Sequence, residues 1–124
     1  FDPEDRLRWA NAWFRSTYGV DPTLAPTWED MLRACHRLRR GVLIETEDFD
    51  AWLAGVRQRY RRSPVRRFES DLCDGRWTTV TETVLPGGWL LMAINDVTPL
   101  KTAETQARQA LAEKRWPPKD LQTT

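Results

Sequence analysis

Few residues of this chain could carry out chemistry on a substrate. His36 is its single histidine, and Cys35 and Cys73 are its two cysteines. No Ser/His/Asp arrangement can be assembled around that histidine, and Gly87-Gly88 is typical of a hairpin turn, not of a phosphate-binding loop. The two cysteines lack the spacing of metal ligands. We therefore expect no catalytic site and no metal site in this chain.

Two clusters of like charge are candidate binding sites of another kind. The segment "RQRYRRSPVRR", residues 57–67, carries six arginines and could contact nucleic acid. The acidic segment "ETEDFD", residues 45–50, could bind a cation. Simpler explanations are a solvated helix face for the arginines and carboxylates that favour a helix N-terminus for the acids. We favour the simpler explanations, and nucleic-acid binding stays open as a third alternative.

Length and composition limit the class of protein. A chain of 124 residues with 40% hydrophobic and 30% charged residues is typical of one globular domain. Its longest apolar run, residues 89–94, is far too short to cross a bilayer, and two cysteines are too few for a disulfide framework. We expect a soluble, cytoplasmic domain without membrane contact. Because residue 1 is Phe and not an initiator Met, we expect the sequence to be a piece of a longer protein.

The first residues predict a hairpin. Asp2 suits the first corner of a turn, and Pro3 fixes φ for the second. Residues 6–9 then alternate polar and apolar side chains, which is typical of a half-buried strand. Phe1 would be the last residue of the partner strand, so we expect the first strand to be truncated here.

Three helices are predicted next. Asn11 can cap a short helix that Gly19 ends. Thr27, with Asp30 three residues later, resembles a capping box at the start of a second helix. A third helix is expected from about residue 48 to residue 61, because its apolar residues form one stripe and its arginines lie mostly opposite.

The second half of the chain is rich in strand-forming residues. Phe68, Ser70 and Leu72 alternate with acidic residues, and "DG" at residues 74–75 and "PGG" at residues 86–88 are turn signals. The segments "RWTTVTETVL" and "WLLMAIND" are typical of strands. They predict a three-stranded antiparallel meander, which with the first hairpin makes five strands.

A polar helix should follow the last strand directly. Thr98 suits the N-cap and Pro99 the first helical position. "WPP" at residues 116–118 should end this helix, and the residues after it are expected to be disordered. The apolar residues of the helix recur every three or four positions and form a narrow seam of the kind that pairs with another helix: Leu100, Ala103, Ala107 and Ala110 or Leu111.

The end of the last strand carries the most specific pattern in the sequence. After "DGRW" and "GGW" comes "DVTPLKTAE", in which Asp96, Thr98, Lys101 and Glu104 match a strand-to-linker signature D-(I/V)-T-x-x-K-x-x-E. With "WAN" at residues 9–11, which matches the corner after the second strand, these residues resemble a PAS domain. PAS domains are sensory modules found in bacterial proteins in front of diguanylate cyclase (GGDEF) and histidine kinase domains. The resemblance spans nearly the whole chain.

The resemblance implies an α+β PAS fold with a core at residues 1–98 and a C-terminal linker helix and tail at residues 99–124. The core would be a five-stranded antiparallel sheet in the order 2-1-5-4-3 with helices on one face and often a small-molecule pocket between them. Asp96 would tie the last strand to the linker helix, and Thr98 would cap that helix. A ligand or partner would shift this packing and so signal to an output domain.

The resemblance also implies partners and bears on cofactors. A homodimer and a covalently linked output domain, such as a diguanylate cyclase or histidine kinase, are the expected partners, so any enzyme activity would belong to the output domain. Haem-binding members carry their ligand on the long helix, here "DFDAWLAGVRQRYRR", whereas His36 lies on the helix before it. Photoreceptor members trap flavin with a cysteine in an "NCRFLQ"-like segment, which this chain lacks. We expect neither haem nor flavin.

The candidate pocket would be surrounded by the second strand, the helices and the last two strands. Such walls would suit a small apolar or amphipathic ligand, and an arginine reaching inward could anchor a carboxylate. The alternative is a fully packed core, in which case the domain would be a ligand-free interaction and dimerisation scaffold. The pocket candidates are Trp9, Trp28, Leu32, Val56, Val80, Leu91 and Ala93.

Overall fold

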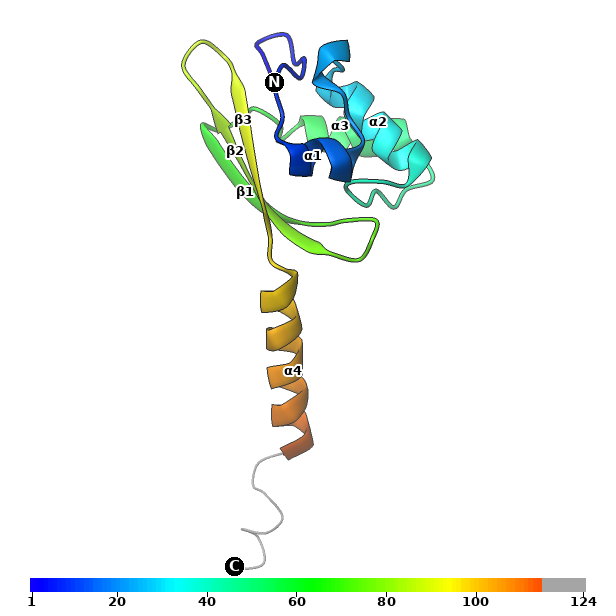
Figure 1. Cartoon of the computed structure of the whole chain (residues 1–124), viewed down its shortest axis with the longest axis vertical. Coiled ribbons are helices and arrows are strands. Elements are labelled where there is room, and N and C mark those ends of the chain that lie inside the picture. The colour runs from blue at the N-terminus through cyan, green and yellow to red at the C-terminus, as the bar shows by residue number, and fades with distance from the viewer. Residues whose placement is uncertain (115–124) are drawn as a thin grey trace, which may run out of the picture.

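A computed structural model describes residues 1–114 of the 124-residue chain. The predicted helix end at residues 116–118 and the predicted disordered tail lie outside the described residues. Figure 1 shows the helices of the first half of the chain on one side of an antiparallel sheet, and the C-terminal helix extending away from the end of the last strand. No helix among residues 1–114 has the length and apolar character needed to cross a bilayer.

Side-chain caps set the starts of the helices on the sheet. In α1 (Ala12–Tyr18) the Asn11 side chain accepts a hydrogen bond from the N–H of Phe14, and Gly19 ends the helix with φ 64°, a conformation that favours glycine. The short 3-10 helix η1 (Pro22–Leu24) follows. In α2 (Trp28–Leu38) Thr27 and Asp30 form the reciprocal capping box. The predicted boundaries of α1 and start of α2 are confirmed.

The third helix, α3 (Phe49–Arg57), ends four residues earlier than predicted. Asp48 caps its start by accepting from the N–H of Ala51. Beyond Arg57 the chain turns, and Arg61 adopts a left-handed conformation with φ 59°, which a continuing right-handed helix cannot include. The predicted extension to residue 61 is therefore wrong.

The sheet consists of β1 (Val65–Asp71), β2 (Trp77–Val84) and β3 (Leu90–Asp96), antiparallel and in the order β1-β2-β3. Its register places Phe68 opposite Val80, and Val80 opposite Ile94. Side chains alternate between a face covered by the helices and an outer face, as the pleat requires. The predicted meander is confirmed.

The prediction of five strands is wrong, because the first two do not form ladders. Arg6 makes a single isolated bridge with Thr27. Phe1 exchanges two backbone hydrogen bonds with Leu90, of 3.0 and 2.9 Å. Only this one residue precedes the Asp2 turn in the sequence, so it supplies one residue pair beside β3 and no strand. The predicted order 2-1-5-4-3 is accordingly seen only in its last three members, as β3-β2-β1.

The core lies between the sheet and the helices. Aromatic rings stack within the core. The ring centroids of Phe14 and Tyr18, both on α1, lie 4.4 Å apart, and those of Trp28 on α2 and Tyr60 after α3 lie 3.8 Å apart. Such pairs add to the free energy gained by burying large apolar side chains. Other buried members come from all the elements around them, including Leu7, Met31, Cys35, Leu53, Leu72, Val80 and Leu90.

Candidate ligand cavity and strand-to-helix joint

A cavity of about 610 Å³ lies between the helices and the inner face of the sheet, a size within the usual range for small-molecule sites. Its roof comes from α2 and α3, with Trp28, Leu32 and Val56 among the lining side chains. Its floor comes from the three strands, including Phe68 and Val80. The cavity is therefore mainly apolar, and helices and strands shape it together.

Four of the predicted pocket residues line this cavity: Trp28, Leu32, Val56 and Val80. The other three lie at the surface, because Trp9 is 75% exposed, Leu91 is 53% exposed and Ala93 is also exposed. On β3 the inward positions belong to the alternate residues, and Met92 is the one that reaches the cavity. The structure thus does not place Trp9, Leu91 or Ala93 in the pocket.

The floor of the cavity also holds an ion pair between neighbouring strands. Arg66 Nε of β1 donates to Glu82 Oε1 of β2 at 2.8 Å, and Glu82 is buried. The Arg66 guanidinium lies over the Phe68 ring, 4.3 Å from its centroid. A buried carboxylate needs such a partner, since an unpaired one would be costly. The pair supplies a fixed charged group to a mainly apolar cavity.

Ser70 brings a second polar group to the floor. Its residue is 7% exposed, it lines the cavity, and its Oγ has no hydrogen-bond partner within residues 1–114. Thr78, opposite on β2, uses its hydroxyl to donate to the Ser70 carbonyl at 2.8 Å and leaves the Ser70 hydroxyl unpaired. A buried hydroxyl without a partner costs free energy, and a bound molecule could remove that cost.

Sequence reasoning missed Arg66, Ser70 and Glu82 as cavity residues. The signal that could have found them is the period of two along each strand. Phe68 shares its face of β1 with Arg66 and Ser70, and Val80 shares its face of β2 with Glu82. Polar residues that alternate onto the same buried face of a strand as apolar residues are candidates for a functional site.

Asp96 and Thr98 form the joint between the last strand and α4 (Thr98–Lys114). Asp96 Oδ1 accepts from the Thr98 N–H at 2.9 Å and from its hydroxyl at 2.6 Å. Thr98 Oγ1 accepts in turn from the N–H of Trp77 on β2 at 2.9 Å. The hydrogen bonds from Thr98 hold the pKa of Asp96 below its usual value. Because α4 begins at Thr98 itself, the prediction of Thr98 as the N-cap and Pro99 as the first helical residue is wrong by one position.

Lys101 connects α4 to the wall of the cavity. Its Nζ lies 3.0 Å from Oε1 of Glu69 on β1 and 5.6 Å from the centroid of the Trp77 ring. Glu69 is among the residues at the cavity, but its half-exposed carboxylate lies on the outer face of β1, because Phe68 and Ser70 on either side of it point inward. Glu104 is exposed and forms no ion pair within the described part of the chain. Of the linker signature, therefore, Asp96, Thr98 and Lys101 contact the sheet.

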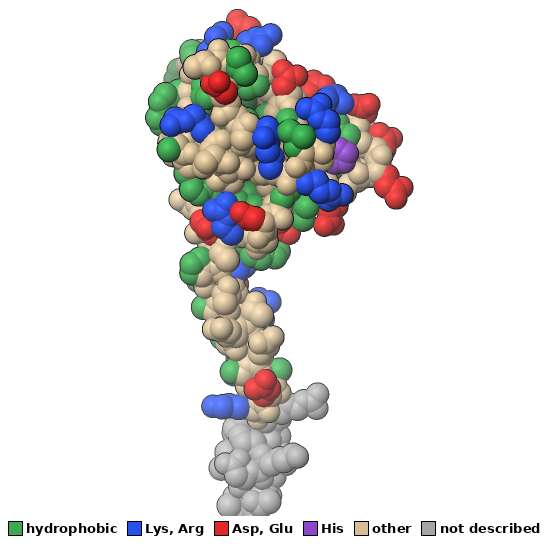
Figure 2. All heavy atoms as spheres, turned by 45° about the vertical axis from the view of Figure 1, so that its right-hand side comes forward, with side chains coloured by type: hydrophobic (Ala, Val, Ile, Leu, Met, Phe, Trp, Pro, Cys, Tyr) green, Lys and Arg blue, Asp and Glu red, His purple; other side chains and the backbone are tan. Residues whose placement is uncertain are grey.

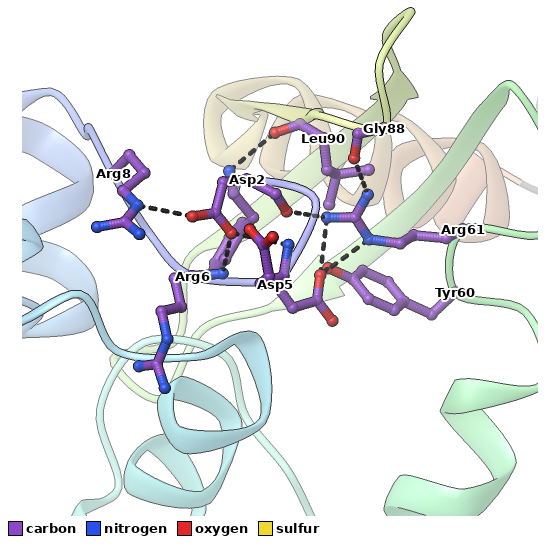
Figure 3. A network of polar contacts seen from close by, with 10 residues as sticks. Asp2, Asp5, Arg6, Arg8, Tyr60, Arg61, Gly88 and Leu90 are labelled. Carbon is purple, nitrogen blue, oxygen red and sulfur yellow. Dashed lines mark hydrogen bonds and ion pairs between the residues drawn. The ribbon is translucent and has the colours of Figure 1, made fainter.

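A separate polar network holds the N-terminal turn against the sheet (Figure 3). Arg61 Nε donates to Asp5 Oδ1 at 2.8 Å, and its terminal nitrogens donate to the carbonyls of Asp2 and Gly88. The Tyr60 hydroxyl also donates to Asp5, at 2.7 Å. Burial, followed by this hydrogen bond, raises the pKa of Tyr60. The network joins the segment after α3 to the first turn and to the β2–β3 hairpin.

Of the other candidates from the sequence, several are paired with other groups, whereas Glu45, Arg59 and Arg67 lie at the cavity. His36 Nε2 is 3.1 Å from the Thr46 carbonyl, and its ring stacks on Phe49. Three of the six arginines in residues 57–67 pair with carboxylates: Arg57 with Glu29, Arg61 with Asp5 and Arg66 with Glu82. Among residues 1–114 no group of three His, Cys, Asp or Glu is placed to hold a metal ion.

Comparison with known proteins gives one match. A family model described as PAS fold matches residues 1–105, which is most of the chain. No curated protein and no solved structure matches the chain significantly. The matched region contains the cavity, the joint and the first turns of α4.

Proposed function

Since the chain belongs to the PAS fold family, we propose that it is a sensory domain that binds a small molecule in its cavity and signals through α4. The output domain that follows α4 would be one such as a bacterial diguanylate cyclase or histidine kinase. The domain itself has no catalytic role in this proposal. Its partners are a small amphipathic molecule, a second copy of the chain and the linked output domain.

The observation that carries the proposal is the position of Glu69. Glu69 belongs to β1, whose inward side chains line the cavity, and its own carboxylate on the outer face of that strand pairs with Lys101 on the first turn of α4. A molecule that moves β1 would therefore move an anchor of the helix. An exposed ion pair of this kind contributes only about 0.2–1 kcal/mol. The hydrogen bonds of Thr98 to Asp96 and Trp77 must therefore act together with it if ligand binding is to shift the equilibrium between two positions of α4 appreciably.

The test is native mass spectrometry of freshly purified protein, compared with the mass of the denatured chain. Extra mass retained only in the native spectrum would support an occupied cavity. A Val56→Trp variant, which fills the cavity, should lose that mass. Val65→Trp is the matched control, because Val65 is 52% exposed at the start of β1, and it should keep the mass. The absence of extra mass from the native spectra of both the unchanged protein and Val65→Trp would contradict the sensory proposal.

A second candidate function is that of a ligand-free dimerisation scaffold. The observation that favours it is the surface of α4, of which no residue is buried. Leu100 is 60% exposed and Leu111 is 74% exposed, and Figure 2 shows hydrophobic side chains along a helix that stands free of the rest of the domain. A seam of this kind normally pairs with another helix. A stable dimer without retained mass would favour this candidate.

A further inference from the structure

One end of the cavity floor offers positive charge with unused hydrogen-bond donors. Within residues 1–114, Arg66 makes one hydrogen bond, from Nε to Glu82, and its two terminal nitrogens have no protein partner. A guanidinium has five N–H donors in a flat fork that matches a carboxylate. Arg59 also lines the cavity and forms no ion pair in the described residues. This end therefore suits an anionic group.

The other end of the floor is polar but uncharged. There Ser70 offers its unpaired hydroxyl, which can pair with a neutral hydroxyl or carbonyl. Its acidic neighbours Glu69 and Asp71 alternate with it along β1, so their carboxylates belong to the outer face. The floor thus has a guanidinium at one end and a neutral hydroxyl at the other.

The middle of the floor is apolar. Phe68 lies between Arg66 and Ser70 on the same face of β1, and Val80 is opposite it on β2. Trp28 and Leu32 line the roof. At about 3.3 Å per residue, the four-residue step from Arg66 to Ser70 spans roughly 13 Å. A ligand that used both ends would therefore be elongated, with an apolar body between two polar groups.

From these observations we propose that the cavity binds an elongated carboxylic acid. The carboxylate accepts from the terminal nitrogens of Arg66, the apolar body lies over Phe68 and Val80, and a distal hydroxyl or carbonyl pairs with Ser70. This inference rests on the proposed sensory function and gives its ligand a chemical class. Glu82 is a positioning residue. It accepts the hydrogen bond from Arg66 Nε, so the two terminal nitrogens of the guanidinium are available to the ligand.

The test uses two probes of equal length, 10-hydroxydecanoic acid and 1,10-decanediol, in calorimetric titrations of the whole domain. The acid should bind the unchanged protein roughly 10- to 100-fold more tightly than the diol, as expected for hydrogen bonds to a charged group. Arg66→Gln should remove that preference. Because this change leaves Glu82 buried without its partner, the double variant Arg66→Gln/Glu82→Gln is measured as well and should show the same loss. Arg62→Gln, at an exposed arginine outside the cavity, is the control and should keep the preference.

Ser70→Ala tests the far end. It should weaken binding of 10-hydroxydecanoic acid about 3- to 10-fold, the value of a neutral hydrogen bond, and leave decanoic acid unaffected. Without ligand it should not lower stability, since it removes an unpaired hydroxyl.

The failure of this inference differs from the failure of the proposed function. Equal binding of acid and diol, or a preference that survives in the Arg66→Gln/Glu82→Gln variant, would overturn the carboxylic-acid assignment. So would a molecule retained in the native mass spectrum that has no carboxylate. In each of these cases the sensory proposal would stand. If neither probe binds and no mass is retained, both fail.

Discussion

Asp2 is a buried carboxylate held by donors of its own turn. Its Oδ1 accepts from the N–H groups of Glu4 and Arg6, and its Oδ2 accepts from Arg8 Nε at 2.6 Å (Figure 3). The hydrogen bond from the Arg6 N–H is the main reason that the pKa of Asp2 lies below its usual value, and the other donors act in the same direction against the effect of burial. The ionised form is thus favoured in the folded protein.

This shift predicts how stability depends on pH. A carboxyl whose pKa is lower in the folded state stabilises the fold above its unfolded pKa, near 4, and that contribution is lost as the pH falls through the folded value. We expect the urea concentration at the midpoint of unfolding to fall once the pH is lowered below about 4. Asp2→Asn should be less stable at pH 7 and should lose less on acidification. Urea unfolding from pH 2.5 to pH 7 measures both, with Glu104→Gln as an exposed control. Parallel acid profiles for Asp2→Asn and the unchanged protein would contradict the prediction.

The hydroxyl of Thr98 makes a second prediction at the scale of one residue. It accepts from the Trp77 N–H and donates to Asp96, so Thr98→Val should lower the free energy of unfolding by about 1 kcal/mol. The matched control is Thr105→Val on the same helix. Within residues 1–114 the Thr105 hydroxyl bonds only to the Lys101 carbonyl, so this change should alter stability by less than about 0.5 kcal/mol. Equal effects of the two changes in urea unfolding would show that the joint adds nothing to stability.

At the scale of elements, local signals were sufficient where a side chain caps its own helix. Asn11, Thr27 and Asp30 act within four residues of their positions, and they lie as predicted. The period of two also grouped Ser70 with Phe68 on one face of β1, because acidic residues alternate with them, although Ser70 was not identified as a cavity residue. These features depend on short-range chemistry that a single sequence contains.

The face of β3 could not be predicted in this way. In its sequence "WLLMAIND" both sets of alternate positions contain apolar residues, so alternation does not show whether Leu91 or Met92 points inward. The register with β2 decides between them, and a one-residue slip would exchange the two faces. The candidates Leu91 and Ala93 were placed on the wrong side for this reason, and the cavity wall formed by Met92 was missed. Trp9 was misplaced because its expected strand forms no ladder.

The apolar seam of α4 carries a prediction about assembly. If the proposed homodimer pairs these helices, Leu100→Glu and Leu111→Glu should each weaken dimerisation at least tenfold, because a charge would be buried in the seam. Neither should lower the stability of the domain by more than about 0.5 kcal/mol, since both side chains are exposed. Gln109→Glu adds the same charge on nearly the opposite side of the helix and is the control. Sedimentation velocity measures the dimer, and unchanged association in both leucine variants would exclude this seam.

At the scale of the whole molecule, charge predicts weak contact with nucleic acid. The net charge is +1, positive and negative side chains are mixed over the face seen in Figure 2, and Arg57, Arg61 and Arg66 are paired with carboxylates. We expect no measurable affinity for generic duplex DNA at 150 mM salt. Fluorescence anisotropy from 20 to 200 mM salt measures it. Measurable binding whose affinity falls steeply with salt, and which is lost in an Arg59→Gln/Arg62→Gln/Arg67→Gln variant, would contradict this prediction and support nucleic-acid binding.

The network around Arg61 has a consequence for the order of folding. It joins residues far apart in the chain, since Arg61 and Asp2 are separated by 59 positions and Phe1 and Leu90 by 89. The sheet, in contrast, consists of two hairpins between chain neighbours. Closing long loops costs entropy before their contacts repay it. The meander should therefore form early and the N-terminal turn dock last, so that loosening this network hastens unfolding and leaves the refolding rate nearly unchanged.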